Sequence, residues 1–156
     1  ATLFLQYLFK KKKIPITVLR LYLVYGPNQD NNRVIPFVIN NCINHKKFNC
    51  SPGYQLRDFT FVSDIVDAIY KTLKSKNTDG QVINIGCGKP TRIRDLIKQI
   101  VKIIGSGKPV FNKLTFRKDE LTKLYPNISK AKRLLKWKPK INLKKGLSNT
   151  IKFHLN

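Results

Sequence analysis

The sequence has no methionine, one tryptophan and only eight acidic residues among 156. It also has no unbroken apolar run of about 18 residues, the length that a membrane-spanning helix needs, so we expect no membrane span. Its cysteines, Cys42, Cys50 and Cys87, are odd in number and unevenly spaced. That pattern favours free thiols in a reducing cytoplasm over a disulfide framework, and it predicts no metal site.

The shortage of acidic residues contrasts with 31 basic ones, which gives a formal net charge of +23. Such an excess is typical of proteins that bind nucleic acid or another polyanion. However, 24 of the basic residues are scattered lysines, whereas a polyanion groove more often combines clustered arginine with aromatic side chains. Compositional drift in an AT-rich genome explains many of these charges. A small basic polyanion-binding protein without catalysis therefore stays the alternative function, and nucleic acid is the less favoured partner.

Apolar segments of strand and helix character alternate, which predicts an α/β fold in one domain over residues 1–156. Segments 16–24 and 81–85 lack polar alternation, as strands buried on both faces of a parallel sheet do. We expect them to lie parallel, with the 91–104 helix packed on a face of their sheet. The other predicted elements are helices at 2–12, 36–44, 63–73, 129–135 and 143–153 and strands at 48–51, 58–62 and 110–116, with Ser63 and Thr91 as helix caps.

Several short segments occur in an informative order. The first is Leu19-Arg20-Leu21-Tyr22-Leu23-Val24-Tyr25-Gly26-Pro27, and Gln55-Leu56-Arg57-Asp58-Phe59 follows about thirty residues later. The others are Val82-Ile83-Asn84-Ile85-Gly86, Phe116-Arg117-Lys118-Asp119 and Leu135-Lys136-Trp137-Lys138-Pro139. Together they resemble the substrate-binding half of the extended short-chain dehydrogenase/reductases, the NAD-dependent epimerase/dehydratase family that acts on nucleotide sugars. The resemblance covers nearly the whole chain.

The resemblance also implies parts that this sequence lacks. Family members begin with a strand and a Gly-rich turn that holds the dinucleotide pyrophosphate, and Gly86-Cys87-Gly88 lacks the third glycine of such a turn. Their catalytic Tyr-x-x-x-Lys pair lies on a helix that runs on into a segment like 2–9, so the resemblance places that pair before residue 1. We therefore expect a C-terminal half that is inactive alone, with NAD or NADP bound mainly by the other half.

The resemblance further suggests which residues bind the substrate. A guanidinium matches the paired oxygens of a diphosphate, and Arg57 and Arg117 match family arginines that reach it. Arg33 and Tyr25 are the other substrate-binding candidates. Tyr25 is equally compatible with packing, and Arg33 with a solvated loop. A structural partner for Arg57, either Asp58 or Asp64, is the alternative to its diphosphate role.

The loop formed by Tyr22, Gly26 and Pro27 would lie beside the nicotinamide end of the cofactor. Leu23 stands where the family commonly has an asparagine that binds the substrate, so we assign it no catalytic role. It is either core or part of an altered pocket. We interpret Trp137 as a packing anchor for the last helices.

The implied whole enzyme oxidises a sugar hydroxyl by hydride transfer to NAD or NADP, and then epimerises, dehydrates or reduces the keto intermediate. We expect this enzyme to bind a nucleotide-diphosphate sugar, to form a homodimer and to be located in the cytoplasm. Details of the segments resemble bacterial members of deoxysugar and surface-polysaccharide pathways.

Overall fold

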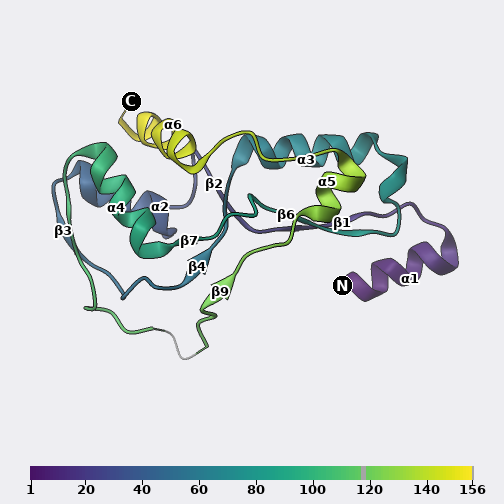
Figure 1. Cartoon of the computed structure of the whole chain (residues 1–156), viewed down its shortest axis with the longest axis horizontal. Helices are drawn as coiled ribbons and strands as arrows, with labels where there is room; N and C mark the ends of the chain where they lie inside the picture. Colours follow the sequence, from purple (N-terminus) through teal and green to yellow (C-terminus); the bar gives the residue numbers. More distant parts are fainter. Residues whose placement is uncertain (117–118, 156) are drawn as a thin grey trace.

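The structure, a computed structural model, describes residues 1–116 and 119–155, in which helices and strands alternate (Figure 1). The helices are α1 (Thr2–Lys12), α2 (Val34–Ile43), α3 (Val62–Lys74), α4 (Ile93–Ile104), α5 (Ser129–Leu135) and α6 (Leu143–Leu155), with a 3-10 turn η1 (Lys76–Thr78). The strands are β1 (Val18–Leu21), β2 (Leu23–Tyr25), β3 (Lys47–Asn49), β4 (Leu56–Arg57), β5 (Phe59–Phe61), β6 (Val82–Ile85), β7 (Thr91–Arg92), β8 (Lys108–Val110) and β9 (Lys123–Leu124).

The expected parallel pair is present: β1 runs parallel to β6, with Val18 opposite Val82 and Leu21 opposite Ile85. The apolar run predicted as one strand over 16–24 is instead two strands separated at Tyr22. The Tyr22 backbone N–H donates to the Ile85 carbonyl oxygen at 3.1 Å, after which β2 runs parallel to β5. The chain therefore changes its pairing partner at Tyr22.

Two hydrophobic clusters occupy different ends of the elongated chain (Figure 1). One joins β6 to α3 and α5, and its buried members are Ile65, Ala68, Ile83, Ile85, Ala131, Leu135 and Trp137. The other joins α2, α4 and α6 to aromatic residues of β2 and β5, with Val38, Ile39, Leu96, Ile100, Leu147, Tyr25, Phe59 and Phe61 among its members. The predicted α/β alternation is thus confirmed, with its core divided between two places.

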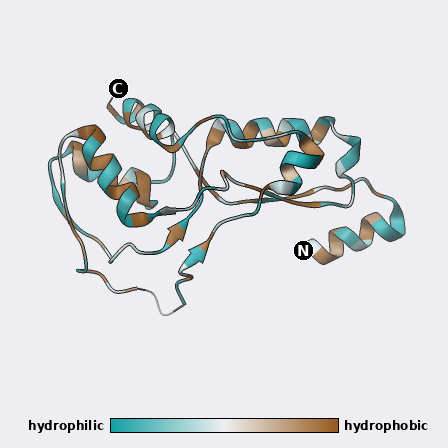
Figure 2. Ribbon diagram, in the orientation of Figure 1, coloured by the Kyte–Doolittle hydropathy of each residue, from teal (hydrophilic) through white to brown (hydrophobic). Residues whose placement is uncertain are grey.

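The packing expected of α4 is wrong. Its buried face contains Leu96, Ile97 and Ile100, which belong to the cluster of α2 and not to the cluster that covers β6. Figure 2 shows apolar and polar bands alternating around α4, as expected for a helix with one buried face. That periodicity predicted the helix correctly but could not indicate which partner it packs on.

Several predicted element ends are also corrected. Helix α3 begins at Val62 with Phe61 as its N-cap residue, so Ser63 lies inside the helix. Thr91 belongs to β7, and Arg92 is the N-cap residue of α4. The strand predicted over 110–116 is β8, which ends at Val110 and is followed by turns.

Asp64 joins the first turn of α3 to the connection between α5 and α6. Its carboxylate accepts the backbone N–H groups of Lys140 and Ile141, each at 3.0 Å. Its carbonyl oxygen accepts the indole N–H of Trp137 at 3.1 Å. Trp137 is fully buried beside Leu135, which confirms its predicted role as a packing anchor.

Helix α1 lies at the edge of the fold and contributes no buried residue. Its residues Leu3, Phe4 and Tyr7 are more than half exposed. Figure 2 shows brown, hydrophobic segments along this helix. Within residues 1–116 and 119–155, none of the helices combines the length and apolar character that crossing a membrane requires.

We expect Asp64→Asn to lower the free energy of unfolding by about 2–3 kcal/mol, because one buried N–H group loses its charged acceptor. Asp95→Asn is the matched control, since Asp95 lies in the first turn of α4 but is exposed. That change should cost no more than about 0.5 kcal/mol. Urea unfolding followed by circular dichroism measures both, and equal losses would show that the Asp64 carboxylate is only a helix-dipole partner.

Candidate functional site

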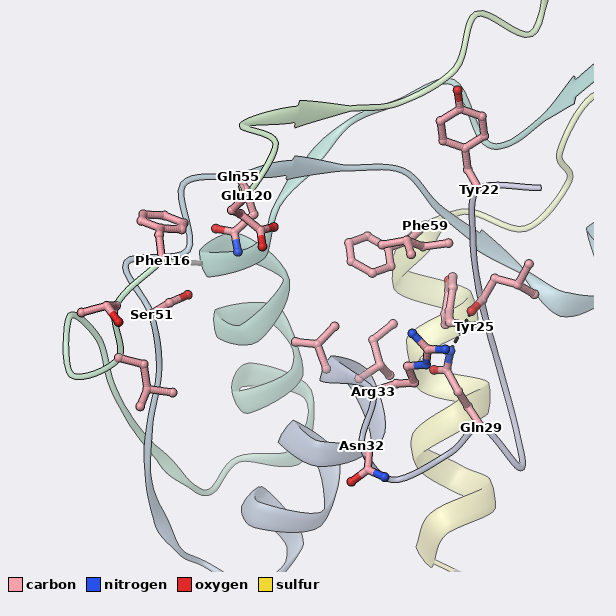
Figure 3. A pocket seen from close by; sticks show the side chains of 16 residues that line it. Tyr22, Tyr25, Gln29, Asn32, Arg33, Ser51, Gln55, Phe59, Phe116 and Glu120 are labelled. Atoms are coloured by element: carbon pink, nitrogen blue, oxygen red, sulfur yellow. Dashed lines mark hydrogen bonds between the residues drawn. The ribbon is translucent and has the colours of Figure 1, made fainter. Parts of the chain in front are cut away.

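Two adjoining clefts lie where β2 and the loop after it face β5 and the segment near Leu114. The larger has a volume of about 680 Å³ and the smaller about 310 Å³. Figure 3 shows the larger cleft, with side chains contributed by β2, the 26–33 loop, the segment before β4, and the segment between β8 and β9. These segments are far apart in sequence, so the cleft depends on the tertiary fold. The carboxyl ends of parallel strands are where open α/β folds bind ligands.

The loop after β2 is held close to its strand. The side-chain amide of Gln29 donates to the Val24 carbonyl oxygen at 2.7 Å. Gly26 allows close approach, because a Cβ at that position would lie 2.7 Å from Val62 Cγ1 on α3. The predicted loop residue Gly26 is thus buried, while Pro27 is half-buried, and neither lines a cleft.

Tyr25 lines the larger cleft but is almost fully buried, with an exposed fraction of 2%. Its ring packs edge-on against Phe59 and Phe61, and its hydroxyl donates to the Leu143 carbonyl oxygen at 3.4 Å. Burial raises the pKa of this phenol well above its ordinary value. The structure therefore gives Tyr25 a packing role in the cleft wall, and its hydroxyl is already engaged by α6.

Two other predicted residues line the same cleft. Arg33 is the N-cap residue of α2 and is exposed, and its backbone N–H donates to the Asp30 carbonyl oxygen at 2.9 Å. Tyr22 is half-buried at the point where the chain leaves β6. Figure 3 shows these two side chains on well-separated parts of the wall, with Arg33 beside Gln29.

Arg57 lines the smaller cleft, with its side chain 10% exposed. Its guanidinium donates to the Leu56 carbonyl oxygen at 2.8 Å and forms an ion pair with Glu120. The structural partners considered from the sequence, Asp58 and Asp64, are wrong, since both carboxylates accept backbone N–H groups elsewhere. Glu120, the single glutamate of the chain, lines both clefts.

Asp58 is fully buried between Arg57 and Phe59, two residues that line the clefts. Its carboxylate accepts the backbone N–H groups of Cys87 at 2.7 Å and Gly88 at 2.6 Å, and the hydroxyl of Thr60 at 2.9 Å. These bonds attach the loop after β6 to the strand that carries the candidate arginine. They also explain why Gly86 needs to be small, because a Cβ there would lie 2.9 Å from an Asp58 oxygen.

Arg117, the second arginine predicted to bind the diphosphate, lies outside the described residues. Leu23 lies within the described residues, where it is 38% exposed and lines both clefts. It belongs to neither hydrophobic cluster. The alternative that Leu23 is a core residue is therefore wrong. Its side chain is part of the cleft surface.

Sequence reasoning missed several polar residues of the clefts. These residues are Gln29, Asn32, Ser51, Gln55 and Glu120. They have no sequence motif in common. It also overlooked two pairs with Tyr-x-x-x-Lys spacing, Tyr7 with Lys11 and Tyr70 with Lys74. None of these four residues lines either cleft. In the part of the chain that the structure describes, no cluster of His, Cys, Asp and Glu is arranged to hold a metal ion.

Comparison with known proteins shows the family to which this chain belongs. Residues 1–86 match the model of the NAD dependent epimerase/dehydratase family, so the chain belongs to that family. The dTDP-D-glucose 4,6-dehydratase of Homo sapiens is 30% identical over 99% of this chain, which spans 45% of that protein. The UDP-glucuronate 4-epimerase of Thermodesulfobacterium geofontis is 34% identical over 88% of this chain, which spans 42% of it.

Solved structures agree with that assignment. The UDP-glucose 4-epimerase of Thermotoga maritima was solved with UDP-glucose, and it superposes with a TM-score of 0.91 at 29% identity. That match covers 99% of this chain and 50% of the epimerase chain. The UDP-glucuronic acid 4-epimerase of Bacillus cereus was solved with UDP-glucuronic acid and NAD, and it superposes with a TM-score of 0.85 at 33% identity. That match covers 95% of this chain and 48% of the epimerase chain. The chain thus spans about half the length of these relatives, and its fold is part of an extended short-chain dehydrogenase.

Cys87 provides a test of the local environment of the loop that Asp58 holds. Burial, with a further contribution from the Asp58 carboxylate, raises the pKa of this half-buried thiol to about 11. Since only the thiolate reacts, iodoacetamide should modify Cys87 at pH 8 roughly a hundredfold more slowly than an ordinary thiol. Mass spectrometry should find a rate that rises about tenfold per pH unit up to pH 10. A plateau below pH 9, or the same rate as in urea, would contradict this environment.

Proposed function

We propose that this chain is the substrate-binding half of a nucleotide-sugar epimerase, dehydratase or reductase, and that it binds the diphosphate of the substrate through Arg57. The observation that carries the proposal is the pair of adjoining clefts at the carboxyl end of β2, with Arg57 in one and Arg33 in the other. Two cationic side chains on a surface shaped this way suit an elongated, doubly charged ligand. We also infer that residues 1–156 act as one substrate-binding unit.

The Glu120 carboxylate would compete with the diphosphate of the ligand for the Arg57 guanidinium. Arg57 is largely buried, so an unpaired guanidinium there would be costly, and Glu120 supplies the compensating carboxylate. A diphosphate approaching Arg57 would replace that carboxylate by a stronger, bidentate partner. In this proposal Glu120 keeps Arg57 in place without ligand and moves aside when the ligand binds, and Arg117 contributes a further cation.

One relative supports a finer proposal about the pathway. The CDP-abequose synthase of Salmonella muenchen is 29% identical over 85% of this chain, which suits a role in bacterial deoxysugar or surface-polysaccharide synthesis. We propose that the whole enzyme uses NAD or NADP, bound mainly by residues outside these 156, and works as a cytoplasmic homodimer. Tyr22, Gly26 and Pro27 would then face the nicotinamide end of the cofactor. The cofactor supplies the redox chemistry, and this half orients the sugar.

Arg57 and Glu120 should have opposite effects on affinity for a nucleoside diphosphate. Arg57→Ala should weaken the binding of UDP-glucose by about 1.5–3 kcal/mol, the scale of a hydrogen bond to a charged group. Glu120→Gln should strengthen it severalfold, because the competing charge is removed while the side chain keeps its size. Isothermal titration of the 156-residue chain and its variants measures both changes.

Lys74→Ala is the control for total charge, because Lys74 lies at the far end of α3 and lines neither cleft. It should change the affinity by less than about twofold. If Lys74→Ala weakens binding as much as Arg57→Ala, and both losses follow salt concentration alike, the chain is a general polyanion binder and the clamp does not exist.

The chain by itself should not turn over a nucleotide sugar. No lysine is among the described residues that line the two clefts, so no Tyr-x-x-x-Lys pair of the kind that the family uses for catalysis is placed there. Incubation of residues 1–156 with UDP-glucose or dTDP-glucose and NAD, followed by chromatography of the sugar, should return only starting material. A new nucleotide sugar in that mixture would refute the division of labour proposed here.

A further inference from the structure

Leu23 is an exposed apolar side chain in the part of the lining that the two clefts share. It is the first residue of β2, is paired in register with Phe59, and contributes to the lining of both clefts. Two more apolar residues line both clefts, the half-buried Val34 and the 52% exposed Leu114. The polar residues common to both are Asn32, Ser51, Gln55 and Glu120. We refer to the three apolar residues that line both clefts, Leu23, Val34 and Leu114, as the apolar patch, and to the four polar ones as its polar rim.

A ligand that is held by Arg57 in the smaller cleft and extends into the larger one passes the residues that line both. Two groups are attached to the diphosphate of such a ligand, the nucleoside and the sugar, and in this inference the sugar is the group beside the patch. A hydroxyl that replaced water by the Leu23 side chain would lose its hydrogen bonds without compensation, whereas a methyl group would gain by burial. The exposed patch thus discriminates between two kinds of substituent by desolvation alone.

We propose that Leu23 is a specificity-determining residue that makes this cleft prefer a nucleoside diphosphate sugar with a methyl carbon, a 6-deoxy hexose, over the corresponding hydroxymethyl sugar. This inference rests on the proposed function and adds the class of sugar. The ligand groups opposite the patch are saturated carbons, and the polar rim binds the remaining hydroxyl groups. Leu23 acts by contact with the substrate and takes no part in proton or hydride transfer.

The test uses two probes that differ by one hydroxyl, dTDP-glucose and dTDP-6-deoxyglucose, titrated into the 156-residue chain. The wild-type chain should bind the 6-deoxy sugar roughly fivefold more tightly, the effect of burying one methyl group in place of a hydroxyl. Leu23→Asn should abolish or reverse the preference, and Leu23→Ala should reduce it to about twofold. Leu21→Asn should leave the ratio at the wild-type value, since Leu21 is 46% exposed on the preceding strand but lines neither cleft.

The outcomes separate this inference from the proposed function. Equal affinities of the wild-type chain for the two sugars, or a preference that survives in Leu23→Asn, would overturn the role of Leu23 and leave diphosphate binding intact. Binding of dTDP as tight as that of both sugars would also overturn it, because the sugar would then not reach the patch. Failure of a folded wild-type chain to bind either sugar or dTDP would overturn the proposed function, and the inference with it.

Discussion

The hydrogen bonds of the buried Asp58 carboxylate fix the backbone on which both clefts are built. Arg57 and Phe59, the two residues beside it, line the clefts, while the carboxylate itself points away to the N–H groups of Cys87 and Gly88. One charged group thus aligns β4, β5 and the loop after β6. A shift of this carboxylate would move the candidate arginine and its neighbouring wall together. The precision of the site therefore depends on a residue that does not contact it.

The few acidic side chains are used in an unexpected way for a chain with 31 basic residues. Asp58 and Asp64, the buried aspartates, accept backbone N–H groups and form no ion pair with a lysine side chain. Buried carboxylates gain more from fixed N–H donors than from flexible lysines, which lose side-chain entropy and solvation when they are ordered. Among the described residues only three ion pairs form, and the pair of Arg57 with Glu120 is the one at the clefts. Most of the positive charge therefore takes no part in ion pairs.

Local sequence signals predicted the elements well and their partners poorly. The helices α1 and α3 follow from apolar periodicity, and the parallel pairing of β1 with β6 follows from apolar runs without polar alternation. Both signals are properties of short segments. The position of α4 on α2 depends on surfaces that are distant in sequence, so periodicity could not give it. The same limit applies to the candidate site: a Gly-Pro turn and an arginine motif located Arg57, but its partner Glu120 is 63 residues away. The resemblance supplied what periodicity could not, a proposal for the class of ligand.

The interruption at Tyr22 connects the fold to the proposed selectivity. An apolar run from 16 to 24 predicts one continuous buried strand, yet the chain leaves β6 after Tyr22 and pairs with β5 instead. The change of partner opens a crevice beside the strand, the kind of position where α/β folds bind ligands. Leu23 is the first residue after the change, so a side chain whose type suits a core is exposed at the crevice. Sequence alone could not distinguish these two environments, because a leucine in an apolar run looks the same in both. The fold converts an apparent core residue into part of the cleft surface, which in our proposal contacts the substrate.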